Sequence, residues 1–342
     1  MAPRSLEELD ALAVIDPEID AVLKSGKLPL PKLDLSSVEA GIHQLRSLEA
    51  LSPPAPAVPE VAESSRKFTT RDGTELNLHV FHQASPAPGP RPLLIYFHGG
   101  GGCMGNPYSV ASLARDLAIA HNCVVVSPQY RLAPEHPWPA GVHDAWDAFE
   151  HISTNADSFS ADVSAGLIVG GVSQGARSAS LIALQAKDSN SPTTPKITGL
   201  YFDAPSFMNP DSVPAEYKER YRSRTDERCL TAPILDADTK ALFDKAYQAD
   251  QASPLYAALN TTPLSKHADI APKAYFSICG MDILRDDGLI YADILESLGF
   301  QTRTNVYPGT PHVFWSVFSW IKQAQKWKAD RTAGVGWLLG RE

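Results

Sequence analysis

The stretch Leu167-Ile168-Val169-Gly170-Gly171-Val172-Ser173-Gln174-Gly175-Ala176-Arg177 decides the fold that we expect for this chain. Its first residues are apolar and β-branched and predict a buried strand, whereas the small residues and leucines of 176–184 predict a helix. Between them lies a G-x-S-x-G pattern, the nucleophile elbow, in which a serine occupies a tight strand-to-helix turn. Gly171 and Gly175 suit this turn because it leaves almost no room for their side chains. The pentapeptide alone is equally compatible with a glycine-rich strand end that exposes a serine.

Composition and charge restrict the kind of protein. The chain has 342 residues and a net charge of -9, which argues against a nucleic-acid partner. The acidic segment Met1–Asp10 lacks the apolar run of a signal peptide, and no window approaches the roughly 18 apolar residues of a membrane span. The four cysteines show no metal-ligand spacing and are expected as buried free thiols. We therefore expect a cytoplasmic protein with no metal and no cofactor.

Most of the chain alternates between buried strands and helices. A β-hairpin with an Asp72-Gly73 turn is predicted over 67–81. Further strands are expected at 93–97, 123–127, 167–170, 198–202, 274–279 and 302–307, and helices at 110–121, 144–153, after Ser173, at 289–298 and at 313–328. The strands are continuously apolar rather than alternating, which indicates an α/β fold whose mostly parallel central sheet is covered by helices on both faces.

Two segments interrupt this alternation and divide the chain. Residues 1–60 contain helical patterns at 5–24 and 36–51 and end in a proline-rich linker. Residues 207–262 carry charged helical stretches at 214–224 and 236–250 and no core strand. We expect the α/β core to comprise 61–206 and 263–342, with 207–262 as a lid. The N-terminal arm could pack on the core or cover the site. The lid is expected to line the site with residues such as Phe207, Met208 and Leu255.

A serine hydroxyl needs an oriented base to act as a nucleophile, so we expect a histidine and a carboxylate near Ser173 at the ends of other strands. Asp282 and His312 each lie in a loop directly after a predicted strand. The resulting order Ser, Asp, His along the chain is the order found in α/β-hydrolases. Asp286 and Asp287 compete with Asp282, although their position also suits capping of the next helix. His312 alone could be a surface histidine at a helix start.

Donors for an oxyanion are predicted after the strand at 93–97. His98 is followed by four glycines, and such a run lets backbone N–H groups approach a ligand oxygen. The N–H of Gln174, next to the serine, is a further donor. A phosphate-binding loop is the alternative interpretation of Gly99–Gly102, but no Gly-Lys-Ser/Thr follows it.

From residue 67 to its end, the chain resembles the hormone-sensitive-lipase-like group of α/β-hydrolase esterases. The resemblance rests on His98-Gly99-Gly100-Gly101, on the Ser173 elbow, and on further motifs in the same order: Tyr130–Ala140, Ser253-Pro254, Asp282–Asp286 and His312. It implies an α/β-hydrolase fold with a helical cap built from residues 1–60 and 207–262. It also implies Ser173 as nucleophile, His312 as base and Asp282 as its orienting carboxylate, with an oxyanion hole formed by the amides of Gly100, Gly101 and Gln174.

The expected function is hydrolysis of a carboxylic ester or lactone of small to medium size through an acyl-enzyme. A tailoring enzyme of secondary metabolism (a dehydratase, a cyclase or a thioesterase that releases a polyketide) is the alternative on the same fold. A hormone receptor of the group lacks the catalytic histidine, whereas His312 is present here. The elbow departs from the usual Gly-Asp-Ser-Ala-Gly-Gly-Asn at Gln174 and Arg177, which leaves the substrate open. The sequence also leaves open whether the chain forms a homodimer.

Overall fold

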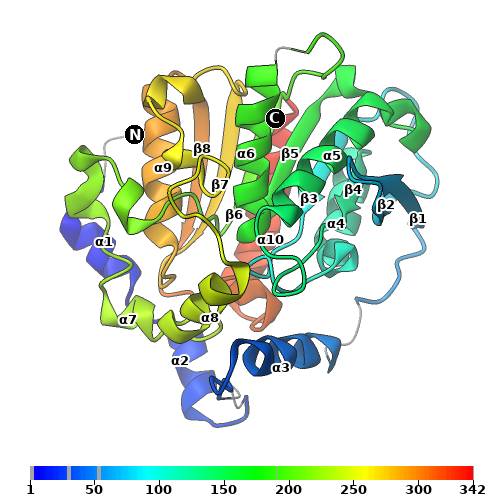
Figure 1. The fold of residues 1–342 in the computed structure, drawn as a ribbon. Coiled ribbons are helices and arrows are strands. Elements are labelled where there is room, and N and C mark those ends of the chain that lie inside the picture. Colours follow the sequence, from blue (N-terminus) through cyan, green and yellow to red (C-terminus); the bar gives the residue numbers. More distant parts are fainter. Residues whose placement is uncertain (1–3, 29–31, 52–54, 190, 342) are drawn as a thin grey trace.

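The computed structural model describes residues 4–28, 32–51, 55–189 and 191–341. Its centre is one eight-stranded sheet in the order β1-β2-β4-β3-β5-β6-β7-β8 (Figure 1). The strands are β1 Val61–Thr69, β2 Glu75–Gln83, β3 Leu93–Phe97, β4 Val124–Pro128, β5 Leu167–Val172, β6 Gly199–Asp203, β7 Lys273–Cys279 and β8 Gln301–Tyr307. The β2 strand runs antiparallel to both of its neighbours, β1 and β4. The remaining pairs, β4-β3, β3-β5, β5-β6, β6-β7 and β7-β8, are parallel. The predicted hairpin and the mostly parallel α/β sheet are confirmed.

Helices cover both faces of this sheet, as the continuously apolar strands predicted. In β3, Leu93, Ile95 and Phe97 face one apolar core, whereas Leu94 and Tyr96 face the other. The first core is closed by α5 (Ala140–Thr154), α6 (Gln174–Ser189) and α9 (Arg285–Ser297), and the second by α4 (Ala111–His121) and α10 (Lys322–Leu338). Among the described residues, no helix combines the length and the apolarity that crossing a membrane requires.

The closing helix differs from its prediction. The sequence indicated a helix from 313 to 328, but only a 3-10 turn forms at Phe314–Ser316, and α10 begins at Lys322. Val313 has a left-handed φ of 44°, which no α-helix accommodates. Phe314, Phe318 and Ile321 are all fully buried. Their spacing of four and three residues imitates a helix, although they reach the core from an irregular segment.

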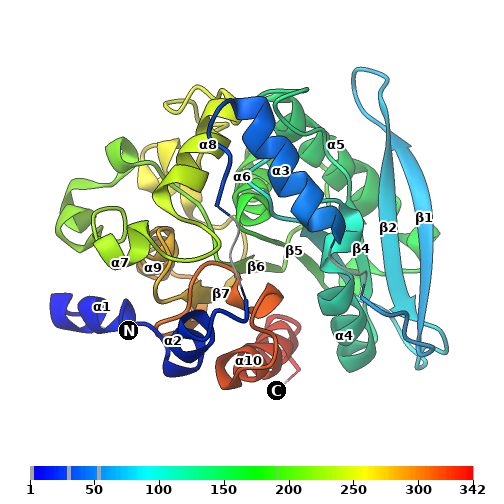
Figure 2. The same cartoon turned by 90° about the horizontal axis from the view of Figure 1, so that it is seen from below.

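The segments outside the sheet form five helices in the described ranges. These are α1 (Leu6–Leu12), α2 (Pro17–Lys24), α3 (Val38–Leu51), α7 (Glu227–Leu230) and α8 (Ala237–Tyr247). The charged stretch expected as a helix at 214–224 is only a 3-10 turn at Ala215–Arg220. All of α2, α3 and α8 are drawn at the lower end of the molecule in Figure 1, but Figure 2 shows that α3 lies beside α8, whereas α2 lies near α10. Gly41 permits the close approach of α3 to α8, because a Cβ there would lie 2.7 Å from the Leu242 side chain.

The N-terminal arm reaches two different parts of the molecule. Ile19 of α2 is fully buried in the same core as α4 and α10. Between α1 and α2, the Asp16 amide donates to the Gly309 carbonyl at 3.0 Å, and the Gly309 amide donates to the Leu12 carbonyl at 2.8 Å. By contrast, Ile42 of α3 packs in an apolar cluster with residues of α8. The first two helices therefore lie on the sheet core, whereas the third lies on α8 and, through Arg46, contacts the carbonyls of Cys103 and Ala133.

Candidate active site

Ser173 stands on the tight turn between β5 and α6. Its φ is 57°, in the left-handed region, and its amide donates to the Asp203 carbonyl at 2.9 Å. A Cβ on Gly171 would lie 2.3 Å from the Gly175 carbonyl carbon, and one on Gly175 would lie 2.1 Å from the Phe97 carbonyl oxygen. Both glycines are therefore required by the close packing of the turn.

The structure brings Ser173, His312 and Asp282 into one hydrogen-bonded array. His312 Nε2 lies 2.9 Å from Ser173 Oγ, and His312 Nδ1 lies 2.6 Å from Asp282 Oδ2. The other Asp282 oxygen accepts from the Leu284 amide at 2.9 Å. All three side chains are buried, with exposed fractions of 8% for Ser173, 6% for His312 and 1% for Asp282. If Nδ1–H donates to Asp282, then Nε2 faces the serine hydroxyl as an acceptor, which is the arrangement of a general base.

The loops that carry Asp282 and His312 support each other. The Gly280 amide donates to the Tyr307 carbonyl at 2.8 Å, and the Met281 amide donates to the Thr310 carbonyl at 2.9 Å. A Cβ on Gly280 would lie 2.5 Å from the Leu12 carbonyl oxygen. The N-terminal arm therefore packs directly against the loops after β7 and β8.

Asp286 and Asp287, the alternatives to Asp282, bind the insertion instead. The Asp286 carboxylate accepts from the amides of Arg222 and Ser223 at 2.7 and 2.6 Å. Asp287 accepts from the amides of Phe207 and Met208 at 3.0 and 3.2 Å. They do not cap α9, since both lie inside its first turn. Sequence reasoning missed this anchoring role, because the partners lie about sixty to eighty residues away.

The glycine run folds closely around the serine. A Cβ on Gly99 would lie 3.4 Å from Ser173 Cβ, and Gly100, Gly101 and Gly102 all have φ values between 62° and 110°. A Cβ on Gly101 would lie 2.5 Å from the Phe243 ring. A Cβ on Gly102 would lie equally close, 2.5 Å, to the Tyr247 ring. Helix α8 of the insertion therefore lies directly on the glycine run beside Ser173.

His98 is a buried neutral support for this run. Its ring stacks on Tyr130 with centroids 4.2 Å apart, and the Tyr130 hydroxyl donates to the His98 carbonyl at 2.8 Å. The His98 Nδ1 lies 2.9 Å from the Gly99 carbonyl, to which an Nδ1–H donates. Burial lowers the pKa of His98 to about 4. The ring is therefore uncharged at neutral pH.

The two unusual elbow residues both face the insertion. Gln174 Nε2 donates to the Tyr247 hydroxyl at 3.2 Å. The Arg177 guanidinium donates to the Ser206 hydroxyl at 2.5 Å and lies 4.3 Å from the centre of the Tyr256 ring. Both side chains are buried, and sequence reasoning did not find their partners.

Contrary to the expectation from the sequence, Phe207 does not line a substrate pocket. Its side chain is fully buried in the sheet core, with its ring centroid 4.9 Å from Phe202 and 4.5 Å from Tyr291. Met208 is also buried in this core. Phe207 lies four residues after the end of β6, and an apolar residue there fits a sheet core as well as a lid.

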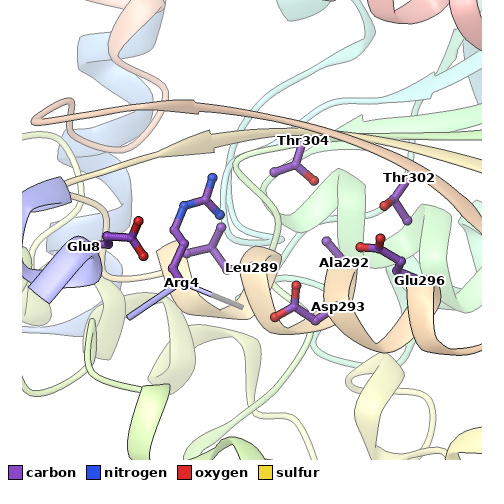
Figure 3. A pocket seen from close by; sticks show the side chains of 8 residues that line it. All are labelled: Arg4, Glu8, Leu289, Ala292, Asp293, Glu296, Thr302 and Thr304. Atoms are coloured by element: carbon purple, nitrogen blue, oxygen red, sulfur yellow. The ribbon is translucent and has the colours of Figure 1, made fainter. Parts of the chain in front are cut away.

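Two surface cavities lie outside the array. Figure 3 shows one of about 260 Å³, lined by side chains of the N-terminal segment, α9 and the edge strand β8: Arg4, Glu8, Leu289, Ala292, Asp293, Glu296, Thr302 and Thr304. Another, of about 440 Å³, is bordered by Arg46, Gly105 and Tyr130. Neither contains a residue of the Ser173 array. In the described ranges, no cluster of histidine, cysteine or acidic side chains is suited to hold a metal ion.

A strand–serine–helix turn at the centre of a mostly parallel sheet, with a histidine and a carboxylate at the ends of later strands, defines the α/β-hydrolase class. Residues 94–316 match a family model described as the alpha/beta hydrolase fold. The chain is 31% identical over 331 residues to an AB hydrolase superfamily protein of Schizosaccharomyces pombe, covering 95% of this chain and 94% of that protein. This chain belongs to the hormone-sensitive-lipase-like family of α/β-hydrolases.

Two further proteins that are similar to this chain have names that state an activity. Carboxylesterase NlhH of Mycobacterium tuberculosis is 30% identical over 303 residues, covering 87% of this chain and 89% of that protein. The crystal structure of vibralactone cyclase superimposes with a TM-score of 0.81 at 28% identity and covers 97% of this chain and 96% of its own. An esterase and a cyclase therefore both resemble this chain over most of its length.

Proposed function

We propose that this protein is a serine-dependent carboxylic ester hydrolase that works through an acyl-enzyme. The observation that carries the proposal is the array in which His312 lies between Ser173 Oγ, at 2.9 Å, and Asp282, at 2.6 Å. Similarity to a carboxylesterase over 87% of the chain supports the same class of reaction.

In the proposed mechanism, Ser173 Oγ attacks the ester carbonyl carbon while His312 Nε2 takes the hydroxyl proton. Asp282 holds the ring and stabilises the imidazolium that forms. The tetrahedral oxyanion accepts hydrogen bonds from the amides of Gly100, Gly101 and Gln174, aided by the positive N-terminal end of α6. His312 then protonates the leaving alcohol, and a water molecule deprotonated by His312 hydrolyses the acyl-enzyme.

We further propose that residues 1–60 and 207–262 form the cap over this site, with 61–206 and 263–342 as the hydrolase core. The packing of α3 on α8 supports this division, as does the position of Phe243 and Tyr247 against Gly101 and Gly102. We expect the cap to determine which substrates are accepted, because the core supplies only the reacting groups.

The test is hydrolysis of a graded series of p-nitrophenyl acyl esters by the whole protein and by the Ser173→Ala variant. Turnover of at least one ester by the wild type is expected, with loss of turnover and of phosphonate labelling in the variant. Labelling that persists in Ser173→Ala, or turnover equal to that of the wild type, would assign the nucleophile elsewhere.

A second candidate is a cyclase that attacks the acyl group with a hydroxyl of the substrate itself. The similarity to vibralactone cyclase at a TM-score of 0.81 favours it, as does the burial of Ser173, which is 8% exposed. Thioesters of hydroxylated acyl chains distinguish the two reactions. A hydrolase yields mainly the free hydroxy acid, whereas a cyclase yields mainly the lactone.

A further inference from the structure

Arg177 differs from the other buried arginines of the described residues because it has no carboxylate partner. Four arginines are at least 96% buried: Arg115, Arg177, Arg285 and Arg331. Three of them have a carboxylate, since Arg115 pairs with Glu63, Arg285 with Asp286 and Arg331 with Asp116. Within the described part of the chain, Arg177 forms no ion pair, and it is 4% exposed.

Among the residues that the structure describes, the Arg177 guanidinium has only neutral partners. Its Nη2 donates to the Ser206 hydroxyl at 2.5 Å and its Nε to the Ser206 carbonyl at 3.4 Å. Its planar face lies over the Tyr256 ring at 4.3 Å. A buried cation is costly unless an opposite charge compensates it, and guanidinium binds carboxylate groups through two parallel hydrogen bonds. The side chain is therefore oriented by neutral groups while its charge remains uncompensated.

Arg177 also lies close to Ser173 along the chain and on α6. It is one helical turn after the serine, since the Arg177 amide donates to the Ser173 carbonyl at 3.1 Å. Residues four apart share one face of a helix, and helical side chains lean toward the N-terminus, so Arg177 leans toward the end of α6 that carries Ser173. Its charge acts on the Tyr247 phenol, whose pKa is nevertheless raised by burial, and that phenol receives the Gln174 hydrogen bond.

We propose that Arg177 binds a carboxylate carried by the natural substrate, so that the substrate class is esters with a free carboxylate beyond the scissile bond. This inference rests on the proposed ester hydrolysis. Ser206 and Tyr256 orient the guanidinium, and the substrate carboxylate supplies the opposite charge. The preference comes from binding, so it affects KM more than kcat.

The test compares two matched pairs of esters. One pair places the carboxylate on the acyl side: monomethyl glutarate and its isostere in which an isopropyl group replaces the carboxylate. The other places it on the alcohol side: the acetate ester of γ-hydroxybutyrate and its isopropyl isostere. The wild type should favour the carboxylate member of one pair by about 10- to 100-fold in kcat/KM, the range of a charge-assisted contact.

In Arg177→Met this ratio should fall to about one, mainly through KM, and Arg177→Lys should retain an intermediate ratio. Arg331→Met is the matched control, because Arg331 is 2% exposed and stacks on Trp327 at 4.2 Å but lies on α10. The control variant should keep the wild-type ratio. A wild type that hydrolyses the neutral member of both pairs equally well or better overturns the proposal, as does an Arg177→Met variant with an unchanged ratio.

Binding measured without turnover separates this proposal from the ester-hydrolase proposal. Calorimetry with monomethyl glutarate and with the acetate ester of γ-hydroxybutyrate is done on Ser173→Ala and on Ser173→Ala combined with Arg177→Met. The second change should weaken the binding of one of the two esters about 10- to 100-fold. Weaker binding without any ester turnover in the wild type would contradict ester hydrolysis alone, whereas turnover without discrimination would contradict the carboxylate site alone.

Discussion

At the scale of single residues, His312 links the proposed nucleophile Ser173 to Asp282. Both of its ring nitrogens have partners, and these partners lie 30 and 139 residues earlier in the chain. Asp282 is itself fixed, because its second oxygen accepts from the Leu284 amide. The orientation of the ring is therefore determined by a carboxylate that is hydrogen-bonded on both oxygens.

Asp282→Asn should remove most of the activity and leave the fold intact. The amide has the same size as the carboxylate, but it favours the wrong histidine tautomer and no longer stabilises the imidazolium. We expect kcat to fall by about 10⁴-fold, as for other orienting aspartates. Steady-state kinetics and circular dichroism measure the two effects. A similar loss of kcat in Asp286→Asn, with Asp282→Asn nearly unchanged, would instead make Asp286 the orienting carboxylate.

Gln174→Ala should change the range of accepted esters more than the chemistry. The proposed oxyanion donor of Gln174 is its backbone amide, which alanine retains, whereas the side chain donates to Tyr247 at 3.2 Å. We expect kcat for a short acyl ester to change less than about tenfold and tolerance for bulkier acyl groups to increase.

Tyr247→Phe provides the matched change, because it removes the same hydrogen bond from the other side. The stability effects of the two substitutions should be less than additive in the double variant, by roughly 0.5–1.5 kcal/mol. Purely additive effects would show that the contact does not couple α6 to α8.

At the scale of elements, α9 holds the insertion in place. Its first turn presents Asp286 and Asp287, which accept hydrogen bonds from backbone amides at both 207–208 and 222–223. Negative charge is favourable at a helix N-terminus, so these carboxylates suit both α9 and the insertion. The same helix directly follows the Asp282 loop. The insertion and Asp282, the proposed orienting carboxylate, are therefore supported by one element.

Asp287→Asn should destabilise the attachment of the insertion. Asp287 is fully buried and lies 3.3 Å from Arg224, which would lose its carboxylate. Breaking a buried ion pair from one side costs about 3–5 kcal/mol. Thermal unfolding should move to lower temperature, and limited proteolysis should cleave within 207–230 faster. Adding Arg224→Met should recover part of the stability, and its failure to do so would show that the ion pair is not the cause.

At the scale of the whole molecule, buried titratable groups make stability depend on pH. Burial lowers the pKa of His98 to about 4. A histidine whose pKa is depressed by folding binds its proton more readily when unfolded, so stability falls as pH decreases from about 6.5 to 4. The buried Asp203 carboxyl acts in the opposite direction, because burial raises its pKa and its stabilising contribution is lost as pH rises. The contribution of His98 must therefore be measured by difference.

The substitution His98→Asn isolates the contribution of His98 to the pH dependence of stability. The side-chain amide of asparagine can replace the Nδ1 donor to the Gly99 carbonyl but does not titrate. Between pH 7 and pH 4 the wild type should lose about 3 kcal/mol more unfolding free energy than the variant. Urea unfolding at a series of pH values measures this difference. Parallel pH profiles for the two proteins would contradict the assignment to His98.

The order of strands and helices and the strand-end positions of Ser173, Asp282 and His312 could be predicted, because they depend on local pattern. Parallel strands bring their carboxyl ends to one edge, so that these three residues could be expected to meet. The prediction of a helix over 313–328 was wrong at its start, because Phe314 and Phe318 only imitate helical spacing. The uncompensated charge of Arg177 and the anchoring role of Asp287 depend on partners far away in the sequence. No local pattern encodes such pairs.

The arm between Leu9 and Ile19 has a consequence for synthesis of the protein. The Lys322 amide donates to the Glu18 carboxylate across 304 residues, and Arg285 donates to the Leu9 carbonyl across 276. At a translation rate of about 5–20 residues per second, the arm waits roughly 15–60 s for its last partner to leave the ribosome. The arm can therefore complete these contacts only after the C-terminal part of the chain has been made.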